Sequence, residues 1–176
     1  LAFDLALEVC SRCKRWDASL EALELMRSSG LKPSLSSYRA VMRSFSGGLS
    51  RQAGLAVQVL GDMAEAGATP DLEILSLATT TCARAGDVPA ALHFLDQARR
   101  LGHRPGDRMY RETILACCKS GRWSQGKDLL HEAQAAPGDA PNAVCYNAVI
   151  KAAGRAGKWK EALSLLDEAV EATAAV

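Results

Sequence analysis

Two kinds of residue recur along this chain at matching intervals of 35 to 37 residues, and they limit its fold more than any other feature. The first is a large apolar or aromatic residue, at Phe3, Tyr38, Leu75, Tyr110 and Tyr146. The second is a proline, at Pro33, Pro70, Pro105 and Pro141. Both series contain the succession 37, 35 and 36, so two independent markers report one repeat. Such a period is the signature of a repeat architecture, in which each unit packs on its neighbours instead of around one central core.

The stretch from Pro141 to Val170 is the most complete unit, and it predicts a helix–turn–helix. Asn142 is a candidate N-cap, because its side-chain oxygen can accept a hydrogen bond from a backbone N–H of the first turn. Gly157 is expected to end this first helix in a left-handed conformation. Three- and four-residue spacings predict a buried stripe of Val144, Ala148, Val149 and Ala152. The second helix opens at Trp159, and its predicted buried side consists of Ala162, Leu163, Leu165, Leu166 and Ala169.

The repeat length, the Tyr146–Asn147 dipeptide, the Ala-Gly-(Lys/Arg) turns and the Gly-x-x-Pro endings together resemble the pentatricopeptide repeat (PPR) family. The resemblance covers the whole chain as five units, at about 1–34, 35–71, 72–106, 107–142 and 143–176. It implies an all-α fold, a right-handed α-solenoid of antiparallel helix pairs. The tetratricopeptide repeat is the nearest alternative, but its tryptophan pattern lies in the first helix. Here the tryptophans open the second helix, which favours the pentatricopeptide family; they are Trp16, Trp123 and Trp159.

The five units predict ten helices with a core of tyrosines and second-helix leucines. The residues predicted to be buried are Tyr38, Tyr110, Tyr146, Leu92, Leu129, Leu130, Leu165 and Leu166. Asp71 and Asp107 are candidate N-caps. Segments 46–49 and 135–140 are longer than their counterparts, so a local shift of the superhelix is expected there. Because the chain opens inside a helix at Leu1 and stops without a Gly-x-x-Pro closure, both ends are expected to lie within a longer array, with any targeting segment upstream.

Six cysteines invite a metal or disulfide interpretation, but the repeat explains most of them. Cys10, Cys82 and Cys117 fall at the same place near the end of the first helix, where cysteine acts as a small hydrophobe. Cys10-x-x-Cys13 lacks a second Cys or His pair at zinc spacing. We therefore expect Cys10, Cys82 and Cys117 to be reduced, buried and metal-free, in a reducing compartment.

The sequence contains no catalytic motif: no nucleophile elbow, no zinc-protease helix and no phosphate-binding loop. We expect neither enzymatic activity, nor a cofactor, nor a small-molecule substrate. No run of 18 apolar residues occurs, so no membrane-spanning helix is expected. The formal net charge of +1, from 21 basic and 20 acidic residues, neither indicates nor excludes a nucleic-acid partner.

The family resemblance implies single-stranded RNA as a partner, with one base addressed by each unit. In the family two short polar residues read the base: one directly follows the aromatic marker, and the other directly follows the closing proline. The corresponding residues here are Asp4 with Ser34, Arg39 with Asp71, Ser76 with Gly106, Arg111 with Asn142, and Asn147, whose partner would lie beyond the chain. None of the four complete pairs fits the family pattern.

Each of these pairs departs from the pattern in a definable way. Arg39 and Arg111 are long and charged, Gly106 offers no side chain, and Asp4 would repel a phosphate-rich ligand. Three of the residues are explained equally well as N-caps, namely Ser34, Asp71 and Asn142. The residues two before the marker form apolar walls around the base in the family. Here they are Leu1, Ser36, Glu73, Arg108 and Val144, of which three are polar or charged.

One basic feature repeats at the end of the first helix in four units, where the family has a lysine that faces the RNA backbone. It consists of Arg12, Arg84, Lys119 and Arg155, with Arg39 and Arg111 as additional phosphate candidates. Cations at this place are also favoured by the helix dipole, so a purely structural role is equally compatible.

These observations favour a non-catalytic adaptor segment that binds other protein subunits of an organellar assembly in a chloroplast or mitochondrion, such as a ribosomal, photosynthetic or RNA-processing complex. The alternative is a segment that binds single-stranded RNA through its phosphates with little base selectivity. The surroundings of the four repeated cations distinguish these hypotheses. Acidic partners beside them favour the adaptor, whereas an open groove favours RNA.

Overall fold

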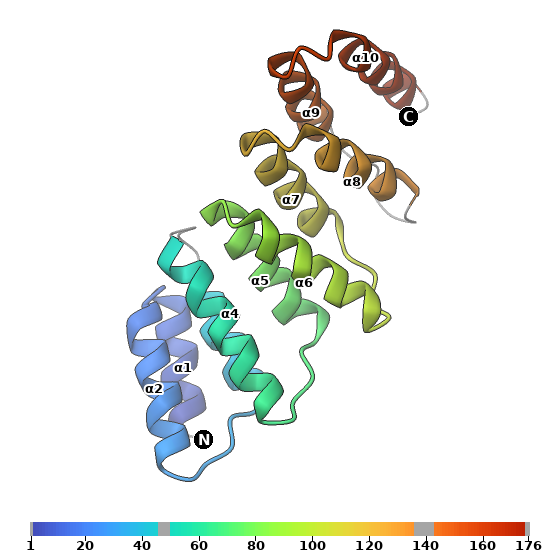
Figure 1. Cartoon of the computed structure of the whole chain (residues 1–176). Coiled ribbons are helices and arrows are strands. Elements are labelled where there is room, and N and C mark those ends of the chain that lie inside the picture. The colour runs from blue at the N-terminus through green and yellow to red at the C-terminus, as the bar shows by residue number, and fades with distance from the viewer. Residues whose placement is uncertain (1, 46–49, 136–142, 175–176) are drawn as a thin grey trace.

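The computed structural model describes residues 2–45, 50–135 and 143–174. These residues form ten α-helices and no strand, which confirms the all-α prediction. The helices follow one another as antiparallel pairs (Figure 1). The pairs are α1 (Ala2–Arg12) with α2 (Trp16–Ser28), α3 (Leu35–Ser44) with α4 (Ser50–Glu65), α5 (Leu72–Ala85) with α6 (Val88–Arg100), α7 (Asp107–Lys119) with α8 (Trp123–Ala135), and α9 (Ala143–Arg155) with α10 (Trp159–Ala174).

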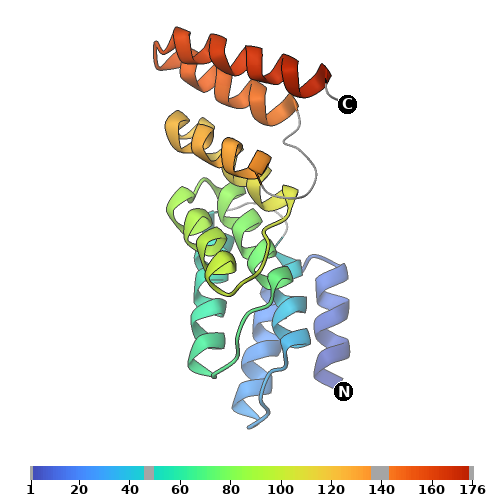
Figure 2. The same ribbon diagram turned by 90° about the vertical axis from the view of Figure 1, so that its right-hand side faces the viewer.

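The pairs stack in chain order into a solenoid, with the two termini at opposite ends (Figure 2). The helix axes turn progressively along the stack, from near vertical in the first pairs to near horizontal in the last. The first helices α1, α3, α5, α7 and α9 contact one another in that order. Each second helix also packs on the first helix of the following pair: α2 on α3, α4 on α5, α6 on α7 and α8 on α9. The core is therefore continuous along the array, as in other solenoids.

The helix boundaries follow from capping chemistry at most sites. Asp71 is the N-cap of α5, where its carboxylate accepts a hydrogen bond from the Ile74 N–H, as predicted. The prediction for Asp107 was wrong. Gly106 is the N-cap of α7 in an extended conformation, and Asp107 is already the first helical residue. Gly157 has a left-handed backbone with φ of 72°, as expected after α9. The predicted cap Asn142 and the longer segments 46–49 and 136–140 lie outside the described residues.

Most of the predicted core is buried: Tyr38, Tyr110, Tyr146, Leu129, Leu130 and Leu165. Leu92 is only half-buried, and the predictions for Leu163, Leu166 and Val144 were wrong because all three side chains are exposed. Leu163 and Leu166 lie on the outer side of α10, which no helix of the described chain covers. Val144 lies on α9 and lines a groove between α9 and α7.

The interface between α8 and its neighbours depends on a glycine. A Cβ atom added to Gly126 would lie 3.0 Å from Cys118 Sγ and 3.7 Å from Val149 Cγ2. We therefore expect Gly126→Val to lower the free energy of unfolding by about 1–3 kcal/mol, because overpacking forces neighbours to move. Urea denaturation followed by circular dichroism measures this change. Gly54→Val in α4 is the control, since a Cβ there meets nothing within 4 Å. Equal losses in both variants would contradict the overpacking explanation.

Candidate nucleic-acid interface

The structure brings together three of the residue pairs that the family resemblance assigns to base reading. Asp4 and Ser34 are connected through Ser37, whose hydroxyl donates to Asp4 Oδ1 at 3.0 Å and lies 3.0 Å from Ser34 Oγ. Ser34 is also the N-cap of α3. Ser76 and Gly106 line one groove between α5 and α7. The third pair, Arg39 with Asp71, forms an ion pair and is part of a larger network described below. The role of these residues in reading a base remains a prediction.

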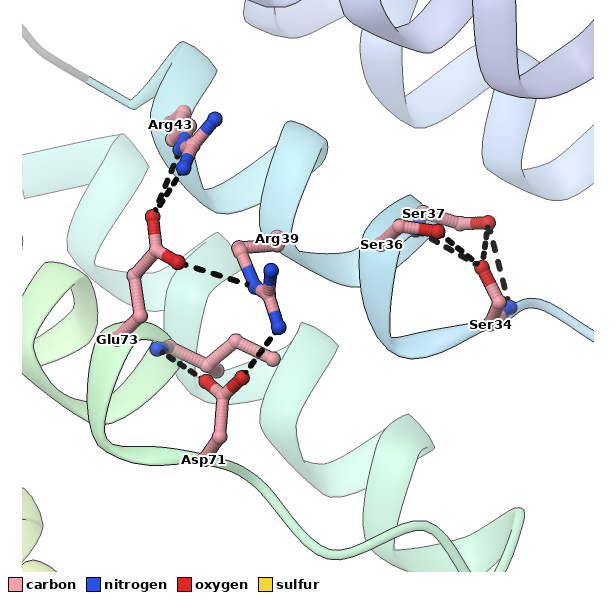
Figure 3. A network of polar contacts seen from close by, with 8 residues as sticks. Ser34, Ser36, Ser37, Arg39, Arg43, Asp71 and Glu73 are labelled. Atoms are coloured by element: carbon pink, nitrogen blue, oxygen red, sulfur yellow. Dashed lines mark hydrogen bonds and ion pairs between the residues drawn. The ribbon is translucent and has the colours of Figure 1, made fainter.

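Arg39 and Asp71 belong to an ion-pair network between α3 and α5 (Figure 3). Arg39 Nη2 lies 2.6 Å from Asp71 Oδ2, and Arg39 Nε lies 3.1 Å from Glu73 Oε2. Arg43 Nε donates to the other oxygen of Glu73 at 2.9 Å. The hydrogen bond to Asp71 raises the pKa of the Arg39 guanidinium. The two candidate base readers, Arg39 and Asp71, therefore bind each other. Glu73, which lies two residues before the marker, binds Arg39 and Arg43, so the charges of this part of the surface cancel.

The four repeated cations divide into two classes. Arg12 pairs with Glu8 of its own helix at 3.3 Å, and Arg84 pairs with Glu112 of α7 at 2.7 Å. The hydrogen bond from Arg84 lowers the pKa of Glu112. Lys119, in contrast, forms no ion pair with any residue that the structure describes. Arg155 has no acidic partner among them either.

Arg155 instead connects the last two pairs through a backbone atom. Its Nη2 donates to the carbonyl oxygen of Cys118 at 3.2 Å, in the last turn of α7. The same carbonyl also accepts from the Gly121 N–H at 3.3 Å, so Arg155 adds a second hydrogen bond at the C-terminus of α7, where a cation is favoured by the helix dipole. Arg111, the additional phosphate candidate of α7, pairs with Asp107 one turn earlier at 3.4 Å, and its proposed partner Asn142 lies outside the described residues.

Lys119 and Arg155 lie at a groove between α7 and α9, which we call the α7–α9 groove. It has a volume of about 340 Å³ and is lined by Leu115, Cys118, Lys119, Val144, Asn147, Ala148, Lys151 and Arg155. Three of these residues are cationic, one is a short amide, and none is acidic. Asn147 is the only candidate base-reading residue in the groove. An apolar floor with a cationic rim suits a ligand that has a flat apolar part and a negative charge, such as a nucleotide.

The groove is positively charged because, at two places in the repeat, the fifth unit lacks an acidic residue that another unit has. Two residues after the aromatic marker, the fourth pair has Glu112, which neutralises Arg84, whereas the fifth has Ala148. Five residues after the marker, the first pair has Glu8, which neutralises Arg12, whereas the fifth has Lys151. The acid that would neutralise Lys119 is absent, and the acid that would neutralise Arg155 is replaced by a second cation.

Comparison with known proteins agrees with this architecture. The family model described as a PPR repeat matches residues 140–170. The pentatricopeptide repeat protein PPR10 of maize, solved in complex with an 18-nt psaJ RNA element, is 26% identical over 97% of this chain, with a TM-score of 0.64. Residues 140–170 thus match a pentatricopeptide repeat, and the described helices have the fold of pentatricopeptide repeat arrays. A search of the curated proteins finds no matching sequence.

Two further solved structures share the fold. The nuclear proteinaceous RNase P 2 of A. thaliana is 16% identical over 95% of this chain, with a TM-score of 0.85. The PPR domain of Arabidopsis thaliana protein-only RNase P 1, solved in complex with tRNA, is 16% identical over 93% of this chain, with a TM-score of 0.76. This chain covers 86% of that domain, but only 37% of RNase P 2 and 28% of PPR10.

Lys151 is the groove residue that reasoning from the sequence missed. The family resemblance directs attention to the residues after the aromatic marker and after the closing proline, and Lys151 occupies neither place. Aligning the five units would have revealed it, because the equivalent residues are Glu8, Arg43, Thr80 and Leu115.

None of the described helices of this array has the length and apolar character needed to cross a membrane.

The cysteines of the array are free thiols in different surroundings. Cys82 and Cys117 are buried as predicted, but Cys10 is only half-buried; among the described helices, α1 packs mainly on α2 and α3. Cys118 and Cys145 are buried and Cys13 is exposed. Burial raises the pKa of Cys82 and Cys118 to about 12, and that of Cys117 above its ordinary value. The described residues contain no cluster of His, Cys, Asp and Glu that could hold a metal ion.

We expect Cys13 to react rapidly with a thiol reagent at pH 8 while Cys82 and Cys118 stay unmodified in the folded protein. A thiol with a pKa of about 12 is thiolate in only about one molecule in ten thousand at this pH, and the thiolate is the reactive form. Brief alkylation followed by peptide mass spectrometry measures each site. Denaturation in urea should make all six cysteines reactive. Rapid labelling of Cys82 in the native protein would show that its surroundings are not as closed as the structure indicates.

Proposed function

We propose that this pentatricopeptide array binds single-stranded RNA through the α7–α9 groove, contacting backbone phosphates with little base selectivity. The observation that carries the proposal is the convergence of Lys119, Lys151 and Arg155 beside Asn147, with no acidic residue in the lining. None of these three cations is paired with an acid among the described residues, and Arg155 donates only to a backbone carbonyl, so their charges are available to replace the counterions of a phosphate chain. PPR10, the 26% identical structure, was solved with an RNA element, which supports the same class of ligand for this chain.

Low selectivity follows from the state of the base-reading positions. Arg39 and Asp71 bind each other, Gly106 has no side chain, and Arg111 pairs with Asp107. Among the candidate readers that the structure describes, Asn147 is the one amide, and it lines the α7–α9 groove; Ser76 lines another groove, but its partner position is Gly106. A single reader discriminates by about 1–3 kcal/mol at most, taking good base contacts in DNA as the scale. One such contact is too little to specify a sequence of several bases.

Selection from a randomised single-stranded RNA pool tests both parts of this proposal. We expect binding at low salt and no enriched motif of three or more bases. With three phosphate contacts, the logarithm of the binding constant should fall with the logarithm of salt with a slope of about −2, or about 20-fold between 50 and 200 mM. Absence of binding at low salt would contradict the RNA function. A reproducible motif of three or more bases would contradict the low selectivity.

A non-catalytic protein adaptor is the second candidate, and the network of Figure 3 favours it for the first three pairs. There Arg39, Arg43 and Arg84 are neutralised by acids of the following pair, which leaves a balanced surface suited to protein subunits rather than to phosphates. The location proposed for either role is a chloroplast or mitochondrion, and it rests on the family resemblance. Purification of the native assembly from fractionated cells tests it: recovery of the chain outside organelles and without companion subunits would reject the adaptor role.

A further inference from the structure

The positive charge at the ends of the first helices is unevenly distributed along the array. Arg12 and Arg84 each lie beside an acid, at 3.3 and 2.7 Å. In the α7–α9 groove, by contrast, Lys119, Lys151 and Arg155 lie together, and none of the residues that line the groove is acidic. Three cations therefore face one groove with no acid in its lining, whereas the cations at the ends of α1 and α5 are neutralised.

These three side chains converge on one end of the groove. Lys151 precedes Arg155 by one helical turn, so both lie on the same face of α9. Arg155 Nη2 donates to the carbonyl oxygen of Cys118 at 3.2 Å, and Lys119, the last residue of α7, follows Cys118 directly. That bond uses one of the five N–H groups of the guanidinium, which leaves donors for a ligand.

A group with more than one negative charge suits such a cluster better than an internal phosphate of RNA does. A phosphodiester carries one negative charge, whereas a phosphomonoester carries about −1.5 to −2 at pH 7 and offers three acceptor oxygens. Where one unit addresses one base, a strand that follows the array places successive phosphates at successive pairs. Such a strand needs one available cation at each pair, but Arg84 is already bound to Glu112. Three unneutralised cations at one pair match a single group of higher charge.

The groove between α5 and α7 gives an internal comparison. It is larger, at about 630 Å³, and Ser76 and Gly106 line it at base-reading positions. Two of its charged residues, Arg43 and Glu73, are bound to each other. The lining then leaves a single cation, Arg108, for a phosphate. This groove has room for a base but lacks the cluster of cations that distinguishes the α7–α9 groove.

The other end of the α7–α9 groove has room for the base of the same nucleotide. Asn147 precedes Lys151 by one turn on the same face of α9, so the two residues are about 6 Å apart along the helix axis. A single nucleotide spans this separation between its base and its phosphate. The floor beside Asn147 is apolar and consists of Leu115, Val144 and Ala148. Base and phosphate of one nucleotide thus find matching surfaces in one groove of about 340 Å³.

We propose that the α7–α9 groove binds the phosphate-bearing end of a single-stranded RNA. Lys119, Lys151 and Arg155 hold the terminal phosphomonoester, and the attached base lies against the apolar floor beside Asn147. This inference rests on the proposed function and states which part of the RNA occupies the groove. The low base selectivity is unaffected, because a terminal phosphate has the same charge whichever base carries it.

Displacement of a labelled RNA, followed by fluorescence anisotropy, compares four unlabelled RNAs as competitors. Three have one sequence and carry a 5′-phosphate, a 3′-phosphate or hydroxyl groups at both ends. The fourth has hydroxyl ends and two more nucleotides, so its charge matches that of the phosphate-ended RNAs. We expect a phosphate-ended RNA to bind at least about tenfold more tightly than both hydroxyl-ended RNAs, because it adds charge-assisted hydrogen bonds. The RNA that does so identifies which end is bound.

The outcomes separate this inference from the proposed function. Equal affinities for the three RNAs of one length would overturn the inference and leave the proposed function intact. If the longer RNA binds as tightly as the phosphate-ended ones, total charge explains the gain and the inference is wrong. Absence of binding by all four RNAs at low salt contradicts the proposed function itself.

A free nucleotide offers the same phosphate without an RNA chain, so adenosine 5′-monophosphate is the fifth competitor. We expect it to displace the labelled RNA only weakly, because it lacks the phosphates of the neighbouring nucleotides. Displacement as effective as that by the phosphate-ended RNA would show that the groove binds a free nucleotide, and the RNA end would be rejected as its ligand.

A double variant, Lys119→Gln with Lys151→Gln, locates the phosphate. Both lysines are exposed, and we expect the preference for the phosphate-ended RNA to fall from about tenfold to below about threefold. The matched control is Lys127→Gln with Lys160→Gln, which removes the same charge from α8 and α10, two helices that contribute no residue to the groove lining. The control should keep the preference, and thermal melts establish that both variants are folded. A preference that survives in the groove variant would place the phosphate elsewhere and refute the assignment.

Discussion

Replacing Leu130 by alanine should lower the free energy of unfolding by about 2–5 kcal/mol, because a fully buried leucine loses its burial and leaves a cavity. Leu130 lies in α8, where that helix meets α9, so the loss falls on the interface between two pairs. In a solenoid the stability is a sum of unit and interface contributions. We therefore expect the last two pairs to unfold first in the variant. Urea denaturation gives the total change, and hydrogen exchange gives its position along the chain.

Leu166→Ala is the matched control for this prediction. Leu166 occupies the same place in α10 as Leu130 in α8, with the same side chain, but it is 48% exposed in the isolated chain. The loss measured at low protein concentration should stay below about 1 kcal/mol, since little apolar area is removed from burial. Similar losses at the two positions would show that the two helices are not packed as the structure describes.

The fold could be predicted from the sequence because every unit carries the same local signals. Proline and glycine mark where each pair ends, tyrosine and leucine mark the buried side, and the period is independent of any contact between distant residues. Predictions failed where a residue depends on a neighbouring unit. Leu166 has the same spacing as Leu130, but among the described helices only Leu130 is covered by the first helix of a following pair. Asp107 was mistaken for a cap because Gly106 can cap through backbone geometry alone.

The candidate site was predictable to a smaller extent. The family resemblance pairs Arg39 with Asp71, and the structure places these two side chains 2.6 Å apart as an ion pair, while their role as base readers stays a prediction. It could not show which cations are neutralised, because that depends on residues of the next helix. Arg84 and Lys119 occupy equivalent positions, yet Glu112 lies beside the first and Ala148 occupies its place beside the second. Whether a cation is neutralised or lies in an open groove therefore depends on which residue of the next helix lies beside it, and only the structure shows that.

Changing Lys119, Lys151 and Arg155 together to glutamine should reduce the affinity for single-stranded RNA by about 500-fold at 50 mM salt. Each phosphate contact contributes about 0.7 to the slope of the binding constant against salt, and three contacts at this concentration account for nearly three orders of magnitude. The salt dependence itself should almost vanish in the variant. Fluorescence anisotropy of a labelled RNA in a salt series measures both quantities.

The matched control changes Arg12, Arg43 and Arg84 to glutamine. Both variants lose three positive charges from a chain with a net charge of +1, so any difference between them reports where the charges lie and not how many there are. The control cations are bound to Glu8, Glu73 and Glu112, so the charge that each would offer to a phosphate is already neutralised by a neighbouring acid. We expect the control to bind RNA within about threefold of the native protein, a difference of well under 1 kcal/mol. Equal losses in both variants would mean that RNA is attracted by overall charge, and the α7–α9 groove would then have no special role.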